Sequence, residues 1–144
     1  MLSILADTSH VIQLAVGPAF MLAALGGTLT VLTNRLARVN DRTLKRRDDL
    51  ERLGSDAIQR AAIDEELATL NRRAKVINAA VSAGAGCAIL VCVLIASLFL
   101  GNELEFRFDR PVAVLFILAM LGLVATYLLL LVEIFIAQRS INPT

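Results

Sequence analysis

The sequence predicts an all-α membrane protein with three transmembrane helices, of which the first two extend into an antiparallel helical hairpin in the cytoplasm. Three apolar runs are each long enough to cross about 30 Å of hydrocarbon, at about 1.5 Å per helical residue. Hydrophobic residues make up 57% of the 144 residues and charged residues only 19%, below the roughly 25% of soluble domains. Eleven of the 14 Lys and Arg residues fall between Arg35 and Lys75. This middle segment is therefore the part expected in water.

The first predicted element is a transmembrane helix over residues 11–33, preceded by a leader at residues 1–10 that we expect outside the cytoplasm. A secretory signal has an apolar stretch of about 7 to 15 residues after a basic leader. Here the apolar stretch is longer, and the leader carries Asp7 and His10 instead of lysines. We expect this first helix to be retained in the mature protein.

Residues 34–75 are predicted to form the cytoplasmic hairpin, because apolar residues recur there at alternating spacings of three and four. Gly54-Ser55-Asp56 lies between the two arms. Glycine ends helices, and Ser or Asp caps the next one, so the turn is expected near 54–56. The stripe comprises Leu32, Leu36, Val39, Leu50 and Leu53 on the outgoing arm and Ile63, Leu67, Leu70, Ala74, Ile77 and Val81 on the return.

The remaining elements are a second transmembrane helix at 76–100, an outer loop at 101–111, a third transmembrane helix at 112–137 and a tail at 138–144. Orientation follows from the excess of Lys and Arg in cytoplasmic loops. The middle segment has eleven, the outer loop two and the leader none. The amino terminus is therefore expected outside, with the carboxyl terminus in the cytoplasm.

An arginine collar is predicted where the first helix leaves the bilayer, since Arg35, Arg38 and Arg42 share one helix face. Such arginines also set topology and touch anionic lipid headgroups. An ionised carboxylate facing lipid would cost several kcal/mol, so Glu133 is expected to be neutral, to face protein or to pair with a cation. Its depth makes Arg35 the first expected partner and Arg38 the second. The collar or gating candidates are Arg35, Arg38, Asp41, Arg42 and Glu133. A static clamp and a gating or proton-sensing role remain equal alternatives.

A stripe of small and weakly polar residues runs along one side of the first helix, opposite a leucine-rich side. Small residues let helices pack closely in lipid, so the stripe is either a packing face or the lining of a pore made by several copies. Three helices alone hardly enclose an aqueous path, and we therefore expect a homo-oligomer. The stripe consists of Gln13, Gly17, Phe20, Ala24, Gly27, Thr28 and Val31.

The run Asn-Arg-Leu-Ala-Arg-Val-Asn-Asp-Arg at residues 34–42, together with the acid Glu133 in the last span, carries a resemblance. With these features the chain resembles, over nearly its whole length, an uncharacterised bacterial family of small three-span membrane proteins, a domain of unknown function. The resemblance implies this topology and a location in the bacterial inner (plasma) membrane. It implies no activity.

Motifs of enzymes are absent from the sequence: it has no phosphate-binding loop, no Rossmann glycine fingerprint and no Cys or His cluster with metal-ligand spacing. We expect no catalytic, cofactor-binding or metal-binding residues. Nucleic acid is not expected as a partner, because no aromatic residue lies between Arg35 and Lys75.

Two functions remain open from the sequence. One is an oligomeric ion channel or pore, lined by the first helix, with the arginine collar at its cytoplasmic mouth. The other is a membrane-anchored scaffold, whose hairpin docks a cytoplasmic protein through residues 43–72 or anionic lipid. Assembly or lipid organisation through the basic collar is a third, related interpretation.

Overall fold

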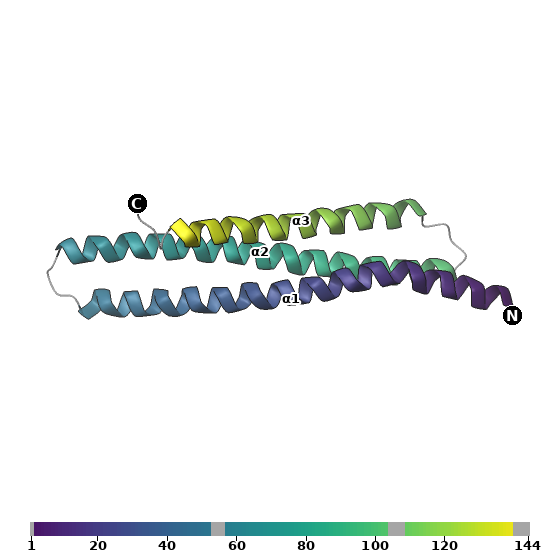
Figure 1. The fold of residues 1–144 in the computed structure, drawn as a ribbon, viewed down its shortest axis with the longest axis horizontal. Coiled ribbons are helices and arrows are strands. Elements are labelled where there is room, and N and C mark those ends of the chain that lie inside the picture. Colours follow the sequence, from purple (N-terminus) through teal and green to yellow (C-terminus); the bar gives the residue numbers. More distant parts are fainter. Residues whose placement is uncertain (1, 53–56, 104–108, 140–144) are drawn as a thin grey trace. The chain divides into compact units, whose positions relative to one another are not determined.

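The computed structural model describes residues 2–52, 57–103 and 109–139, and all of them are helical (Figure 1). The helices are α1 (Leu2–Arg52), α2 (Ala57–Glu103) and α3 (Asp109–Arg139). Each contains a segment long and apolar enough to span a membrane. No strand occurs in the part of the chain that the structure describes. The prediction of an all-α protein with three helices of membrane-spanning length is confirmed.

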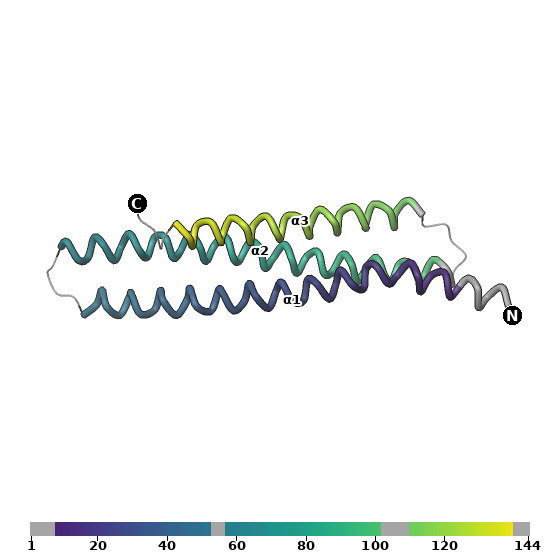
Figure 2. Tube along the Cα trace, in the orientation of Figure 1, coloured from purple at the N-terminus to yellow at the C-terminus, as the bar shows by residue number. Residues whose placement is uncertain are grey.

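α1 and α2 each join an apolar segment to a charged one in a single unbroken helix (Figure 2). α1 begins at Leu2, within the expected leader. Residues 2–16 contain neither Gly nor Pro, so no residue there interrupts the helix. The helix also continues through Pro18. The turn predicted at 54–56 lies outside the described residues.

α3 begins at Asp109, slightly before the predicted start of the third span at residue 112. Pro111 falls in its first turn, where the backbone N–H groups have no partner within the helix. Proline is therefore compatible with this early start. The helix ends at Arg139.

The chain divides into two compact units, and each contains parts of all three helices. The first comprises residues 1–29 and 83–125. Its core consists of Leu25, Cys87, Val91 and Ala119. The Cys87 thiol donates a hydrogen bond to the carbonyl oxygen of Ala119 at 3.0 Å. A Cβ added at Gly122 would lie 3.2 Å from the Cys87 Cβ, so α2 and α3 approach closely here.

The second unit comprises residues 30–82 and 126–144. Its core combines seven of the eleven residues of the predicted apolar stripe with Ala80 and residues of α3. Leu32 and Ile77 are fully buried, and the side chains of Leu129 and Leu130 pack against the same cluster. The complete set is Leu32, Val39, Leu70, Ile77 and Ala80, with Leu36, Ala74, Val81, Leu129 and Leu130 packed around them.

Candidate functional site

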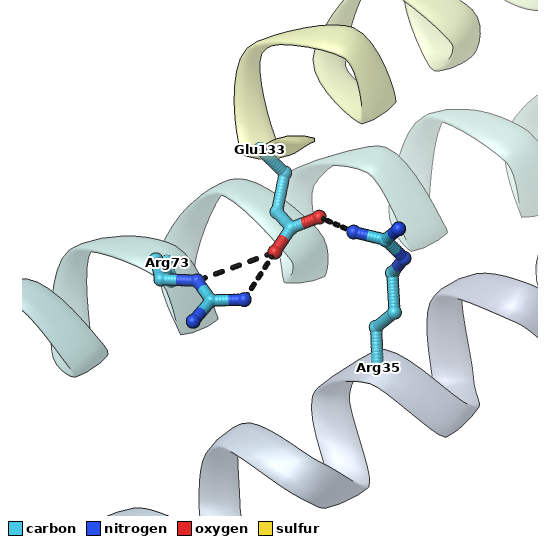
Figure 3. Close-up of polar contacts among 3 residues, drawn as sticks. All are labelled: Arg35, Arg73 and Glu133. Carbon is cyan, nitrogen blue, oxygen red and sulfur yellow. Dashed lines mark hydrogen bonds and ion pairs between the residues drawn. The ribbon is translucent and has the colours of Figure 1, made fainter. Parts of the chain in front are cut away.

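An acid on α3 lies between one arginine on α1 and another on α2, all within the second unit (Figure 3). Glu133 follows Leu129 and Leu130 by one helical turn and thus shares the face that packs into the core. Arg73 lies three residues after Leu70 and four before Ile77, on the buried face of α2. Local helix geometry therefore directs both side chains inward.

The Glu133 carboxylate uses each of its oxygens for a different arginine. Oε1 accepts hydrogen bonds from Arg73, at 2.8 Å from Nη2 and 3.3 Å from Nε. Oε2 accepts a hydrogen bond from Nη1 of Arg35. The exposed fraction of the side chain is 0% for Glu133, 14% for Arg73 and 33% for Arg35. The most buried group is thus the carboxylate, and the exposure increases from Arg73 to Arg35.

These three residues form a charge cluster that ties all three helices together. Burying an ionised carboxylate costs several kcal/mol unless cations and hydrogen bonds compensate. Guanidinium groups provide both, because each has several N–H donors in a fixed plane and stays charged. With two arginines on one carboxylate, the cluster keeps a formal charge of about +1. Its chemistry is electrostatic, and no group of His, Cys, Asp or Glu residues suited to a metal ion occurs among the described residues.

Of the five collar candidates, the structure brings Arg35 and Glu133 together, and this is the pair expected from their depths. The second expected partner, Arg38, does not contact Glu133. Its side chain is exposed, as are those of Asp41 and Arg42. None of these three is ion-paired with another described residue. Glu133 lies at the level of Arg35, and its second oxygen is occupied by Arg73.

Arg73 is the residue of this cluster that the sequence does not single out, since it is one of eleven basic residues between Arg35 and Lys75. A signal was nevertheless present, because Arg73 has the helical spacing of the apolar stripe at Leu70 and Ile77. A charged residue within such a stripe has to find a buried partner.

The stripe of small residues from Gln13 to Val31, called the α1 stripe from here on, lies on a side of α1 that the described residues leave largely exposed. Six of its seven residues are exposed, and Thr28 is half-buried. Phe20 is 74% exposed. A Cβ added at Gly17 or Gly27 would meet no atom within 4 Å. Among the residues that the structure describes, the stripe is therefore not a packing face between helices of the same chain.

The hairpin arms carry further ion pairs within the second unit. Arg46 bridges the arms through Glu66 at 2.9 Å and also contacts Asp49 at 3.3 Å, while Arg52 contacts Asp48 at 2.9 Å. These side chains are 41–77% exposed, so each pair contributes at most about 1 kcal/mol. An open hollow of about 520 Å³ lies beside them, lined by Arg46, Asp49, Arg52, Gln59, Ala62, Ile63 and Glu66.

Comparison with known proteins gives a family but no activity. No curated protein and no solved structure matches the chain. The family described as "Protein of unknown function (DUF2721)" matches residues 15–143, which include Arg35, Arg73 and Glu133. The chain therefore belongs to the DUF2721 family.

Proposed function

We propose that the chain is the subunit of a homo-oligomeric ion-conducting pore in a membrane, with the α1 stripe of each copy facing a common axis. The exposed α1 stripe is the observation that carries this proposal. Facing lipid, Gln13 would lose the hydrogen bonds of its amide, and the glycines at 17 and 27 would have no helix to approach. Neighbouring copies of α1 would cover the small residues, and a water-filled axis would hydrate Gln13.

The positions along α1 support a pore with an apolar constriction and a basic mouth. Phe20 and Val31 are exposed apolar residues on the stripe, and a ring of such side chains restricts ion flow by excluding water. Arg38 and Arg42 continue the same line of the helix. Rings of arginine favour anions. Asp41, which is also exposed, reduces this preference.

Charge distribution supports an orientation with the amino terminus outside and the hairpin and carboxyl terminus in the cytoplasm. The basic mouth would then face the cytoplasm of a bacterial cell, at the inner membrane. Glu133 would act there as a clamp rather than as a gate, because two arginines hold one carboxylate. The root of α1 would thereby stay fixed to α2 and α3 while ions pass along the stripe.

A membrane-anchored scaffold is the second candidate, and features of the hairpin arms favour it. Leu44 is 65% exposed and Ile58 is 83% exposed, although both lie in charged segments. The hollow lined by Arg46 and Glu66 is close to the same arms. A cytoplasmic protein docking on residues 43–72 would cover these apolar side chains.

Ion flux into liposomes that contain the purified full-length protein tests the pore directly. We expect anion flux from the wild type and a several-fold increase with Phe20→Ser, since a polar ring admits water. Leu14→Ser is the matched control, because Leu14 is also exposed on α1 but lies off the stripe. Equal effects of the two substitutions would contradict the pore. Absence of flux at all pH values and voltages, with a specific protein captured by the hairpin, would favour the scaffold.

A further inference from the structure

We infer that the part of the second unit near Glu133 binds the phosphate groups of anionic phospholipids through a basic belt of Arg38, Arg72 and Lys75. All three side chains are exposed. None of them is ion-paired with another described residue. Their charge is thus available to a partner outside the chain.

The basic belt lies at the level of the buried charge cluster. Arg38 is one helical turn after Arg35, while Arg72 and Lys75 flank Arg73 on α2. Arg35 and Arg73 both contact Glu133, so α1 and α2 are aligned at these residues. The belt therefore occupies one level on the two helices, while Arg35 and Arg73 position those helices.

Charge is strongly segregated between this level and the rest of the hairpin. Residues 34–42 and 71–75 contain six Lys or Arg and one acid, Asp41. Residues 43–70, in contrast, contain five Lys or Arg and seven Asp or Glu. Several of the charges there neutralise one another, as in the pairs of Arg46 with Glu66 and of Arg52 with Asp48. An anion is attracted to the belt and not to the remote parts of the arms.

A phospholipid fits this surface better than a free phosphate ion, because exposed apolar residues lie one to five residues from Arg35 or Glu133 on the same helices. Val31 is 48% exposed, Leu128 is 56% exposed and Val132 is 47% exposed, and all three belong to the second unit. Acyl chains would cover these residues while the phosphate meets the belt. The inference needs only that the three helices cross a bilayer. It assigns Val31 and Arg38 to phospholipid, so for these two residues it is an alternative to their place in the proposed pore.

A fluorescence experiment can measure the lipid preference at this level, since the chain contains no tryptophan. Phe135→Trp replaces an aromatic residue that is 57% exposed on α3 and supplies a single reporter. The full-length protein is reconstituted with brominated phosphatidylglycerol or brominated phosphatidylcholine of the same chain length, and quenching gives the ratio of their binding constants. One Lys or Arg near an anionic surface strengthens binding about fivefold. We expect phosphatidylglycerol to be preferred by at least about threefold.

Two triple variants of equal charge separate the belt from general electrostatics. Arg38→Gln/Arg72→Gln/Lys75→Gln should bring the ratio close to one. The matched control, Lys45→Gln/Arg47→Gln/Arg60→Gln, removes three exposed cations of the arms that also have no ion pair with a described residue. This control should retain the preference.

Three results would overturn the inference. The first is a wild-type ratio of binding constants close to one, and the second is an equal loss of the phosphatidylglycerol preference in both triple variants. The third is a preference that inorganic phosphate abolishes and that chloride at the same ionic strength leaves intact. The last result would indicate a site for a soluble anion. If the belt triple variant does not fold, Arg38→Gln and Lys75→Gln are measured singly, and each should lower the ratio. An unchanged ratio in both would equally refute the belt.

Discussion

The Glu133 carboxylate accepts two hydrogen bonds from Arg73, at 2.8 Å from Nη2 and 3.3 Å from Nε, both through Oε1. This contact joins α3 to α2 in the second unit. Arg35 joins α1 to the other oxygen. The stability of this unit should therefore depend on one acid more than on either arginine, because only the acid has two cationic partners.

Replacement of Glu133 by glutamine should lower the free energy of unfolding by about 3 kcal/mol. Removing one partner of a buried ion pair costs about 3–5 kcal/mol because it leaves an uncompensated charge, and the 33% exposure of Arg35 reduces this cost. Thermal or denaturant unfolding of the detergent-solubilised protein measures the change.

Glu66→Gln is the control for Glu133→Gln. It removes the same charge from an ion pair in which both side chains are more than 40% exposed. An exposed pair contributes at most about 1 kcal/mol, so the control should be nearly as stable as the wild type. Equal destabilisation by the two substitutions would show that burial of Glu133 has no energetic consequence.

The two arginines of the cluster should behave non-additively. Arg35→Gln or Arg73→Gln alone leaves Glu133 with one cation, and Arg73→Gln should be the more costly because Arg73 is less exposed and makes two hydrogen bonds. The double variant leaves a buried carboxylate with neither arginine. Its destabilisation should exceed the sum of the single effects by about 1–3 kcal/mol. If the destabilisations by Arg35→Gln and Arg73→Gln simply add in a double-mutant cycle, this would contradict the idea that both arginines stabilise the same carboxylate.

Arg35 and Arg73 illustrate how far the sequence determines the charge cluster. The depth of Glu133 in its span can be counted along α3, and this count points to Arg35 on α1, which contacts Glu133. The choice of Arg73 depends on the register of α2 against α3. That register is set by side-chain packing around Leu70 and Ile77, which periodicity alone does not fix.

The helices were predicted more completely than their contacts. Apolar length determines three spans, and the absence of proline from both arms explains why α1 and α2 continue beyond them. The start of α1 at Leu2 was not predicted, because a leader of mixed composition carries no strong signal for or against helix. The contact of Cys87 with Ala119 was likewise unpredictable, since it depends on how α2 and α3 pack.

Gly122 should tolerate a methyl group poorly, in contrast to Gly86. A Cβ at Gly122 would lie 3.2 Å from the Cys87 Cβ, whereas one at Gly86 would meet nothing within 4 Å. Gly122→Ala should thus be destabilising by about 1–2 kcal/mol through overpacking. Gly86→Ala should be neutral or stabilising by up to about 1 kcal/mol, because alanine favours helix. Unfolding of the two variants under identical detergent conditions measures the difference, and equal stabilities would argue against a tight α2–α3 contact.

The two adjacent glycines of α1 distinguish an interface between copies from a surface that faces lipid. Gly26 and Gly27 are both exposed, and an added Cβ meets nothing within 4 Å at either residue. They point about 100° apart on the helix, and only Gly27 belongs to the α1 stripe. Gly27→Leu should therefore disrupt the oligomer, while Gly27→Ala and Gly26→Leu should preserve it. Chemical crosslinking or mass measurement in detergent reads out the oligomeric state, and loss of the oligomer with Gly26→Leu but not with Gly27→Leu would place the interface on another face of α1.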